Sequence, residues 1–366
     1  MPTSLIPALD PAPLPGPPWL FQVLWVLTFL VHLLLVDTVL GGSLLAALSG
    51  LSGAARREVQ TLVVGINTWT ISLAITFAIA PLLFIQVVLG RFFYSATILV
   101  AWLWLGMLGL LTVGYYLNYL AKARLHRGRG AGVLLVVEAL CFLGIAAVQV
   151  TVSLLHMQPD RWERVAGSVW AALADPTFVP RYLHFVLAAV ALAGAMVAWV
   201  AVRRARKGGD AEALAAMARY GVRAALIATL LQLVDGFWLL LTLPEEVLRG
   251  FMRGGPATMV PLTIGILAGI LLLVVLAQVA DPLAVPNKVR RVAELTVGAV
   301  VFMVLTRHQL RGLYLAASRA GEQAQVTPQW GPLALFLAVF VVCVALAVWA
   351  VVKAVRDRPA PGEEAA

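Results

Sequence analysis

Charged residues are scarce in this sequence. Only 12% of its 366 residues are Asp, Glu, Lys or Arg, against 61% that are hydrophobic, and the mean hydropathy is +0.93. This composition excludes an ordinary soluble domain and predicts an all-α polytopic membrane protein in contact with the lipid bilayer. The net charge of +9 does not indicate a nucleic-acid partner, because the basic residues lie in short loops between apolar segments.

Cysteine is nearly absent as well. Cys141 and Cys343 both lie in apolar runs, and the sequence has neither a C-x-x-C-H motif nor a C-x-x-C pair. This excludes covalently attached c-type haem and argues against an iron–sulfur cluster or a structural zinc site. Residues 1–18 contain no Lys or Arg, unlike the basic start of a secretory signal peptide. We expect them to form an extended arm before a first span that is retained.

Long apolar segments fill most of the remaining chain. Each approaches or exceeds the roughly 20 residues that an α-helix needs to cross the hydrocarbon core. We expect one nine-helix transmembrane domain over residues 19–353, then a tail over 354–366, with a kink at Pro81 in the second span. The expected spans are 19–48, 61–89, 95–120, 131–156, 181–202, 214–243, 257–280, 289–306 and 331–353.

The basic residues favour one orientation. Sixteen of them fall in the loops after the first, third, fifth and seventh spans and in the tail, whereas nine fall on the opposite side. By the positive-inside rule, the N-terminus then lies outside and the tail lies in the cytoplasm.

Two histidines lie within apolar segments. His32 is expected near mid-membrane, and His184 about 6 Å into its span from the outer side. An imidazole in hydrocarbon must be hydrogen-bonded, line a cavity or ligate something, because an unsatisfied polar group is costly there. We favour haem iron as the ligated group. Met259 is expected at the depth of His184, and His/Met pairs hold low-spin haem. The alternatives are a polar cap for His184 and a gap-filling role for Met259.

Two arginines near the outer side are further candidates. Arg307 and Arg311 are one helical turn apart, so their guanidinium groups are placed to hold haem propionates or a quinone head group. The alternative is that both side chains simply reach the membrane surface. His156 and His308 are expected to be interfacial side chains or surface partners, and we assign no role to His126.

Acidic residues within the spans leave two interpretations open. Glu138 is either a proton-relay acid or a buried partner of Gln149 or of a hydroxyl group. Asp37 and Asp235 carry the same ambiguity.

Several of these segments occur together in a known family. His32-Leu33-Leu34-Leu35-Val36, Arg181-Tyr182-Leu183-His184 with Gly194-Ala195, and Ala257-Thr258-Met259-Val260 stand in this order along the chain. They resemble the segments that carry the haem ligands in subunit I of the cytochrome bd quinol oxidases. The nine expected spans and the external N-terminus are also similar to that family's architecture.

The resemblance implies a set of roles. His184 and Met259 would ligate a low-spin haem b, and His32 a second, high-spin haem. Quinol would deliver electrons on the outer side, and a second membrane subunit or a cytochrome would be the partner. The implied protein is an oxidoreductase subunit of a respiratory chain in the bacterial cytoplasmic (inner) membrane.

Two departures from the family shape our expectation. The span 95–120 contains no acidic residue, where the family has glutamates, and the outer loop 243–256 is short, where the family has a long quinol-binding loop. We therefore expect a quinol-oxidising cytochrome subunit that passes electrons to a partner cytochrome or to oxygen. The alternative is a haem-free membrane transporter or assembly scaffold with the same fold.

Overall fold

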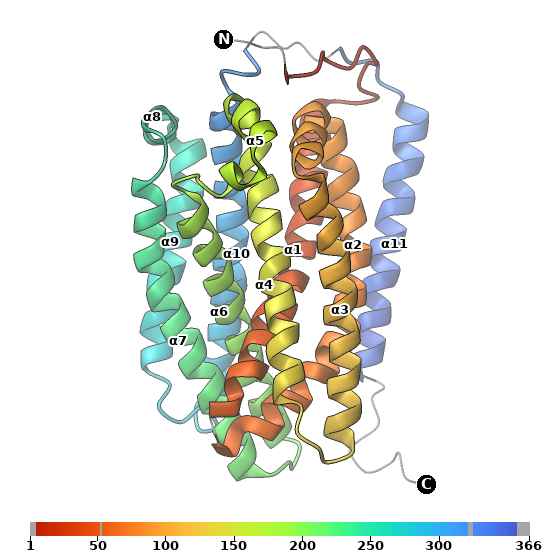
Figure 1. Cartoon of the computed structure of the whole chain (residues 1–366). Helices are drawn as coiled ribbons and strands as arrows, with labels where there is room; N and C mark the ends of the chain where they lie inside the picture. Colours follow the sequence, from red (N-terminus) through yellow and green to blue (C-terminus); the bar gives the residue numbers. More distant parts are fainter. Residues whose placement is uncertain (1–4, 52, 321–324, 357–366) are drawn as a thin grey trace. The chain divides into compact units, whose positions relative to one another are not determined.

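The computed structural model describes residues 5–51, 53–320 and 325–356, which are mainly helical and contain no strand (Figure 1). The predicted all-α class is therefore confirmed. Two short helices, α5 (Trp162–Gly167) and α8 (Glu245–Arg253), precede α6 and α9. The long helices are α1 (Pro18–Leu48), α2 (Arg56–Leu99), α3 (Ala101–His126), α4 (Gly132–Leu155), α6 (Phe178–Ala205), α7 (Ala211–Leu241), α9 (Pro256–Ala277), α10 (Pro286–Leu315) and α11 (Trp330–Arg356).

Eight of the described helices are long and apolar enough to cross a membrane, namely every long helix except α10. The chain is thus an integral membrane protein by length and composition. The expected eighth span, 289–306, does form part of α10. However, charged residues in its first turns, Lys288, Arg290, Arg291 and Glu294, make this helix less apolar than the others. It packs against α6 and α9.

Helix α2 is longer than the expected second span. Its one non-helical residue is Leu89, with φ −140° and ψ 27°, and α3 begins after a second break at Val100. Pro81, where a kink was expected, keeps helical dihedral angles, so the break in dihedral angles within α2 lies at Leu89, two turns further on. The connection expected at residues 90–94 is helical as well.

The chain groups into two compact units, Met1–Ala8 with Leu24–Gly321, and Leu9–Val23 with Glu322–Ala366. In the second unit, the N-terminal arm pairs with the segment before α11. The Leu14 amide donates to the Gln325 carbonyl oxygen at 2.8 Å, and the Thr327 amide donates to the Leu14 carbonyl oxygen at 3.0 Å. Helix α11 extends to Arg356, and residues 357–366, most of the expected tail, lie outside the described residues.

The first unit contains a four-helix bundle. Helix α6 packs against α7 and α10, and α9 packs against the same two helices. Helices α6 and α9 therefore stand at opposite corners of this bundle. Small residues bring α6 and α7 close together, with Gly194 and Ala198 facing Gly221 and Ala225. Helix α4 joins this bundle to α3 by packing against both α3 and α6.

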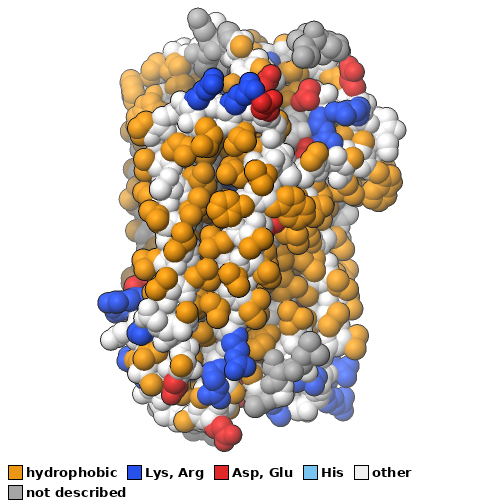
Figure 2. All heavy atoms as spheres, turned by 90° about the vertical axis from the view of Figure 1, so that its left-hand side faces the viewer, with side chains coloured by type: hydrophobic (Ala, Val, Ile, Leu, Met, Phe, Trp, Pro, Cys, Tyr) orange, Lys and Arg blue, Asp and Glu red, His pale blue; other side chains and the backbone are white. Residues whose placement is uncertain are grey.

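The two ends of the first unit differ in charge. The turns after α1, α3, α6 and α9 lie at one end, which we call the basic end, and α5 and α8 lie at the other, the α8 end (Figure 1). These turns and the helix ends that flank them carry most of the basic residues assigned above to the cytoplasmic side. Figure 2 shows hydrophobic side chains over the middle of one face, with most charged side chains towards the ends.

Candidate functional site

His184 lies on α6 and faces α7. Its Nδ1 is 3.2 Å from Asp235 Oδ2, and its Nε2 is 3.4 Å from the side-chain Nε2 of Gln232. Because the amide nitrogen can only donate, His184 Nε2 is the acceptor, and Nδ1–H donates to Asp235. A carboxylate that accepts from one ring nitrogen and orients the other is the arrangement found around histidines that ligate metals.

The sequence of α7 makes room for this imidazole. Gln232 and Asp235 are three residues apart and so lie on one face of the helix. Gly236 lies beside the ring, since a Cβ there would be 3.4 Å from His184 Cε1. Asp235 is buried, and its Oδ1 has no hydrogen-bond partner. The site therefore holds a buried carboxyl group with spare hydrogen-bonding capacity directly behind the histidine.

His32, on α1, is held by α2. Its Nδ1 is 3.0 Å from the carbonyl oxygen of Ala74. Since a carbonyl oxygen only accepts, Nδ1–H is the donor, and the lone pair of the neutral ring is on Nε2. The orientation is again that of a histidine whose Nε2 is available for ligation.

Met259, on α9, lies in different surroundings. It packs with Leu243, Val247, Phe251 and Leu310 in an apolar cluster under α8. No hydrogen bond joins Met259 to His184 in the described part of the chain, and α7 and α10 both lie between their helices. The structure thus places the two expected ligands on opposite corners of one bundle without bringing them into contact.

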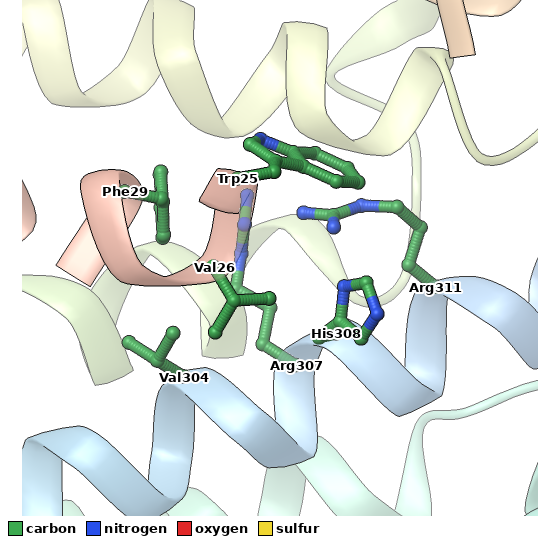
Figure 3. A pocket seen from close by; sticks show the side chains of 7 residues that line it. All are labelled: Trp25, Val26, Phe29, Val304, Arg307, His308 and Arg311. Carbon is green, nitrogen blue, oxygen red and sulfur yellow. The ribbon is translucent and has the colours of Figure 1, made fainter. Parts of the chain in front are cut away.

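Arg307 and Arg311 point from α10 towards α1 and α4. In Figure 3 both guanidinium groups approach the aromatic rings of α1: Arg311 stacks on Trp25, 4.2 Å from the ring centroid, and Arg307 on Phe29 at 4.8 Å. A cavity of about 10 Å³, near the size of one water molecule, lies among these side chains. Neither arginine has the freely solvated position that simple surface charges would have.

The ends of α4 and α10 share these arginines. Arg307 donates to the Ser153 hydroxyl at 2.8 Å, and Arg311 Nε donates to His156 Nε2 at 3.2 Å. The other ring nitrogen of His156 donates to the Val152 carbonyl oxygen at 3.0 Å. His156 is therefore buried and uses both nitrogens, which corrects the interfacial position expected from the sequence. His308 packs edge-on against Trp25.

A third arginine completes a positively charged cluster. Arg181, on α6, lies within electrostatic range of Arg307 and Arg311, and its Nε and Nη2 are buried without a hydrogen-bond partner. The nearby carboxylate of Asp175 is already ion-paired with Arg161. We call Arg181, Arg307 and Arg311 the buried arginine cluster.

Asp175 itself is held ionised. Burial alone would raise the pKa of this carboxyl group, but the hydroxyl and amide of Thr177, the side chain of Gln158 and the charge of Arg161 outweigh it and lower the pKa below its usual value. The Thr177 hydroxyl donates to Asp175 Oδ1 at 2.6 Å. This carboxylate therefore stabilises the segment before α6. It also acts favourably on the charge of Arg181, but it is the one carboxylate near three guanidinium groups among the described residues and is ion-paired with Arg161.

Glu138 lies deep among α1, α2 and α4. The Ser43 hydroxyl donates to its Oε1 at 3.1 Å, and Asn67 Nδ2 donates to both Ser43 and Glu138. Of the expected partners, the hydroxyl group is thus the one found, while Gln149 contacts Met107 Sδ instead. Asp37 is buried with its Oδ1 unpartnered, and His126 is exposed at the end of α3.

Sequence reasoning missed the part played by Arg181. Its position at the start of a span suggested a residue at the membrane surface, yet the helix begins at Phe178 and places its side chain beside α10. A signal was available, because Arg181 stands one turn before His184 on the same helix.

Comparison with known proteins does not extend this description. No family model matches the chain, and no curated protein is significantly similar to it.

Proposed function

We propose that the chain is a membrane-integral cytochrome b subunit that transfers electrons from quinol, through haem, to a partner cytochrome or to oxygen. The observation that carries this proposal is the placement of His184. Its Nδ1–H is bound to the buried carboxyl group of Asp235, and its Nε2 accepts a hydrogen bond from the Gln232 side chain at 3.4 Å, near the upper limit for such a bond. A histidine whose ring is oriented in this way can ligate a metal through Nε2 once the Gln232 amide moves aside.

The surrounding residues fit a haem in two further respects. Haem b carries two propionate groups, which need cationic partners when they are removed from water. The buried arginine cluster has three guanidinium groups, and Arg181 keeps unsatisfied N–H donors. A guanidinium group can pair with a carboxylate through two parallel N–H donors, which is its strongest mode of hydrogen bonding. A quinone head group is the other polar partner that Arg307 and Arg311 suit.

The helix arrangement fits as well. His184 on α6 and Met259 on α9 belong to two helices of one four-helix bundle, and these two side chains would hold the iron of a low-spin haem. His32, with Nδ1 bound to Ala74, is the residue for a second haem. The haem, when bound, supplies one-electron redox chemistry at its iron.

The chain's own residues have defined tasks in this proposal. Asp235 orients His184 and raises the basicity of its Nε2. Val247 and Phe251 of α8 pack in the apolar cluster that contains Met259. Arg307 and Arg311, held by Ser153 and His156, would orient an anionic or polar group between α1, α4 and α10.

A reduced-minus-oxidised optical spectrum of the purified chain, with haem extraction, tests the proposal. Cells are grown with haem available, and wild type is compared with His184→Ala, Met259→Ala and His32→Ala. The matched controls are His126→Ala and Met252→Ala, which remove the same side chains at exposed positions. We expect a low-spin b-type band that is lost in the first two variants and kept in both controls.

Two further results complete the test. Haem lost with His32→Ala would identify the second site, and Asp235→Asn should raise the midpoint potential, because a less basic histidine stabilises the ferric iron less. Wild-type protein without haem would overturn the proposal and favour the haem-free transporter or scaffold. Oxygen uptake driven by quinol would distinguish oxygen from a partner cytochrome as the acceptor.

A further inference from the structure

A cavity of about 220 Å³ lies at the basic end of the first unit, far along α2 from the residues discussed above. Arg56 and Arg57, in the first turn of α2, line it together with Arg129 from the turn between α3 and α4. The buried side chain of Gln60 and the buried Leu125 contribute to its wall. We call this space the arginine cavity.

The turn that carries Arg129 is well defined. Gly128 adopts φ +70°, a left-handed conformation that glycine takes at no steric cost after a helix end. The Arg129 amide donates to the Arg124 carbonyl oxygen at 2.9 Å, and Arg124 Nε donates to the Gly130 carbonyl oxygen at 3.0 Å. Arg129 is therefore fixed opposite the start of α2 by main-chain geometry, not by a flexible loop.

The other wall is fixed by contacts between helices. Gln60 donates to the Ala46 carbonyl oxygen at 3.3 Å, which ties α2 to the end of α1. The Arg56 side chain lies against the first residue of α4, since a Cβ at Gly132 would be 3.5 Å from Arg56 Nη2. Three helix ends and one turn thus line the space, which is open to the surface.

The charge in this cavity is unbalanced. Three guanidinium groups line it, and no carboxylate does. Within the described ranges, Arg56, Arg57 and Arg129 form no ion pair. The N-terminal amides of α2 add positive potential at the same place. Guanidinium groups converging on one space suit a phosphate, which each can bind through two N–H donors.

We propose that the arginine cavity binds the phosphate-containing head group of an anionic phospholipid. The volume suits a head group better than a drug-sized ligand, for which pockets of about 300–1,000 Å³ are usual. Beside the cavity, the surface changes to the apolar type that faces lipid. Val133, in the first turn of α4, is 79% exposed, and Leu120 on α3 is 43% exposed. Acyl chains can therefore lie along α3 and α4 while the head group enters the cavity.

Native mass spectrometry of the full chain tests this site. The protein is released from nanodiscs that contain equal amounts of phosphatidylglycerol, which is anionic, and phosphatidylcholine, which is not. The test variant is R56Q/R57Q/R129Q. The matched control is R204Q/R206Q/K207Q, which removes the same charge from the exposed turn between α6 and α7 at the same end. Size-exclusion profiles and melting temperatures verify that both variants fold.

We expect wild type and control to retain phosphatidylglycerol in preference to phosphatidylcholine. In the test variant this preference should fall at least tenfold, the size of effect expected when several basic residues are removed at a membrane surface. Equal loss in both variants would overturn the site, because it would show only diffuse attraction. Millimolar inorganic phosphate tests the other source of the same chemistry. Saturable phosphate binding that depends on the three arginines, without any lipid preference, would overturn the assignment to a lipid.

Discussion

The crossing of α6 and α7 allows a quantitative prediction, because two glycines meet there reciprocally. A Cβ built on Gly194 would lie 2.7 Å from the Gly221 carbonyl oxygen and 2.8 Å from the Ala225 nitrogen. A Cβ on Gly221 would lie 2.6 Å from the Gly194 carbonyl oxygen. Both contacts are with main chain, which cannot rotate away as a side chain can. The perturbation we choose is Gly194→Ala, the smallest that fills this space.

The magnitude follows from the distance. Relaxing the 2.7 Å contact to an ordinary 3.4 Å requires the helices to separate by about 0.7 Å at the crossing. Overpacking of this kind costs about 1–3 kcal/mol, and main-chain contacts place it near the upper end. Alanine recovers about 1 kcal/mol as the better helix former. We expect a net loss of roughly 2 kcal/mol, or about 3 °C in the melting temperature of a chain of this length.

The same displacement has a functional consequence. His184 and Asp235 lie on these two helices, and a shift of about 0.7 Å would lengthen their 3.2 Å contact beyond hydrogen-bonding range. If His184 holds haem, the spectrum of Gly194→Ala should therefore change along with its stability.

Thermal unfolding of the detergent-purified chain, followed by circular dichroism, measures the effect. The control is Gly298→Ala on α10, where a Cβ would meet no atom within 4 Å. It should be as stable as wild type or slightly more stable, because it gains helix propensity without a clash. A Gly194→Ala protein that melts at the wild-type temperature would refute the argument from backbone contact.

Two further predictions concern charged residues at the α8 end. Asp175→Asn should destabilise the protein at neutral pH. Because folding lowers the pKa of Asp175, its carboxylate contributes stability above the unfolded pKa of 3.8, and this stability is lost as the pH falls through the folded pKa. The melting temperatures of variant and wild type should therefore converge in acid. A gap that stays constant down to acid pH would contradict this assignment. Arg311→Met should weaken haem retention, because it removes a buried guanidinium group that would pair with a propionate. Haem titration measures the effect, and an unchanged haem affinity would exclude Arg311 as a propionate partner.

Histidines in apolar segments could be identified from the sequence because a polar ring within hydrocarbon has few permitted environments. Their partners could not. Asp235 is 51 residues from His184, and only the packing of α6 on α7 brings them together. The carboxylate was noted as a buried acid, but nothing in its local sequence distinguishes an orienting group from a proton relay. Long-range pairing of this kind depends on which helix faces touch, and hydropathy does not specify that.

Helix boundaries show a similar limit. Apolar length and charged ends predicted the long helices well, because the membrane requires an apolar stretch of fixed length. The break at Leu89 in α2 was not predicted, because a leucine in an apolar run carries no local signal for a non-helical residue. Helix α10 was expected as a span, yet its basic first turn and its buried arginines make it the least apolar of the long helices.

The two groups of arginines at opposite ends of the first unit differ in how their charge is stabilised. Arg56, Arg57 and Arg129 are exposed, so water can solvate them when the cavity is empty, and a lipid there contributes binding but is not required for folding. The buried arginine cluster has no such alternative. Arg311 is 5% exposed, and Nε and Nη2 of Arg181 are buried without a hydrogen-bond partner among the described residues. Buried guanidinium groups without a counterion are costly, so an anion at the α8 end should raise the stability of the whole chain. Haem with its propionates is the anionic ligand that would also engage His184. The melting temperature should therefore rise with haem occupancy, and this rise should be smaller in Arg311→Met. In the arginine-cavity variant, the rise in melting temperature on haem binding should equal that of wild type.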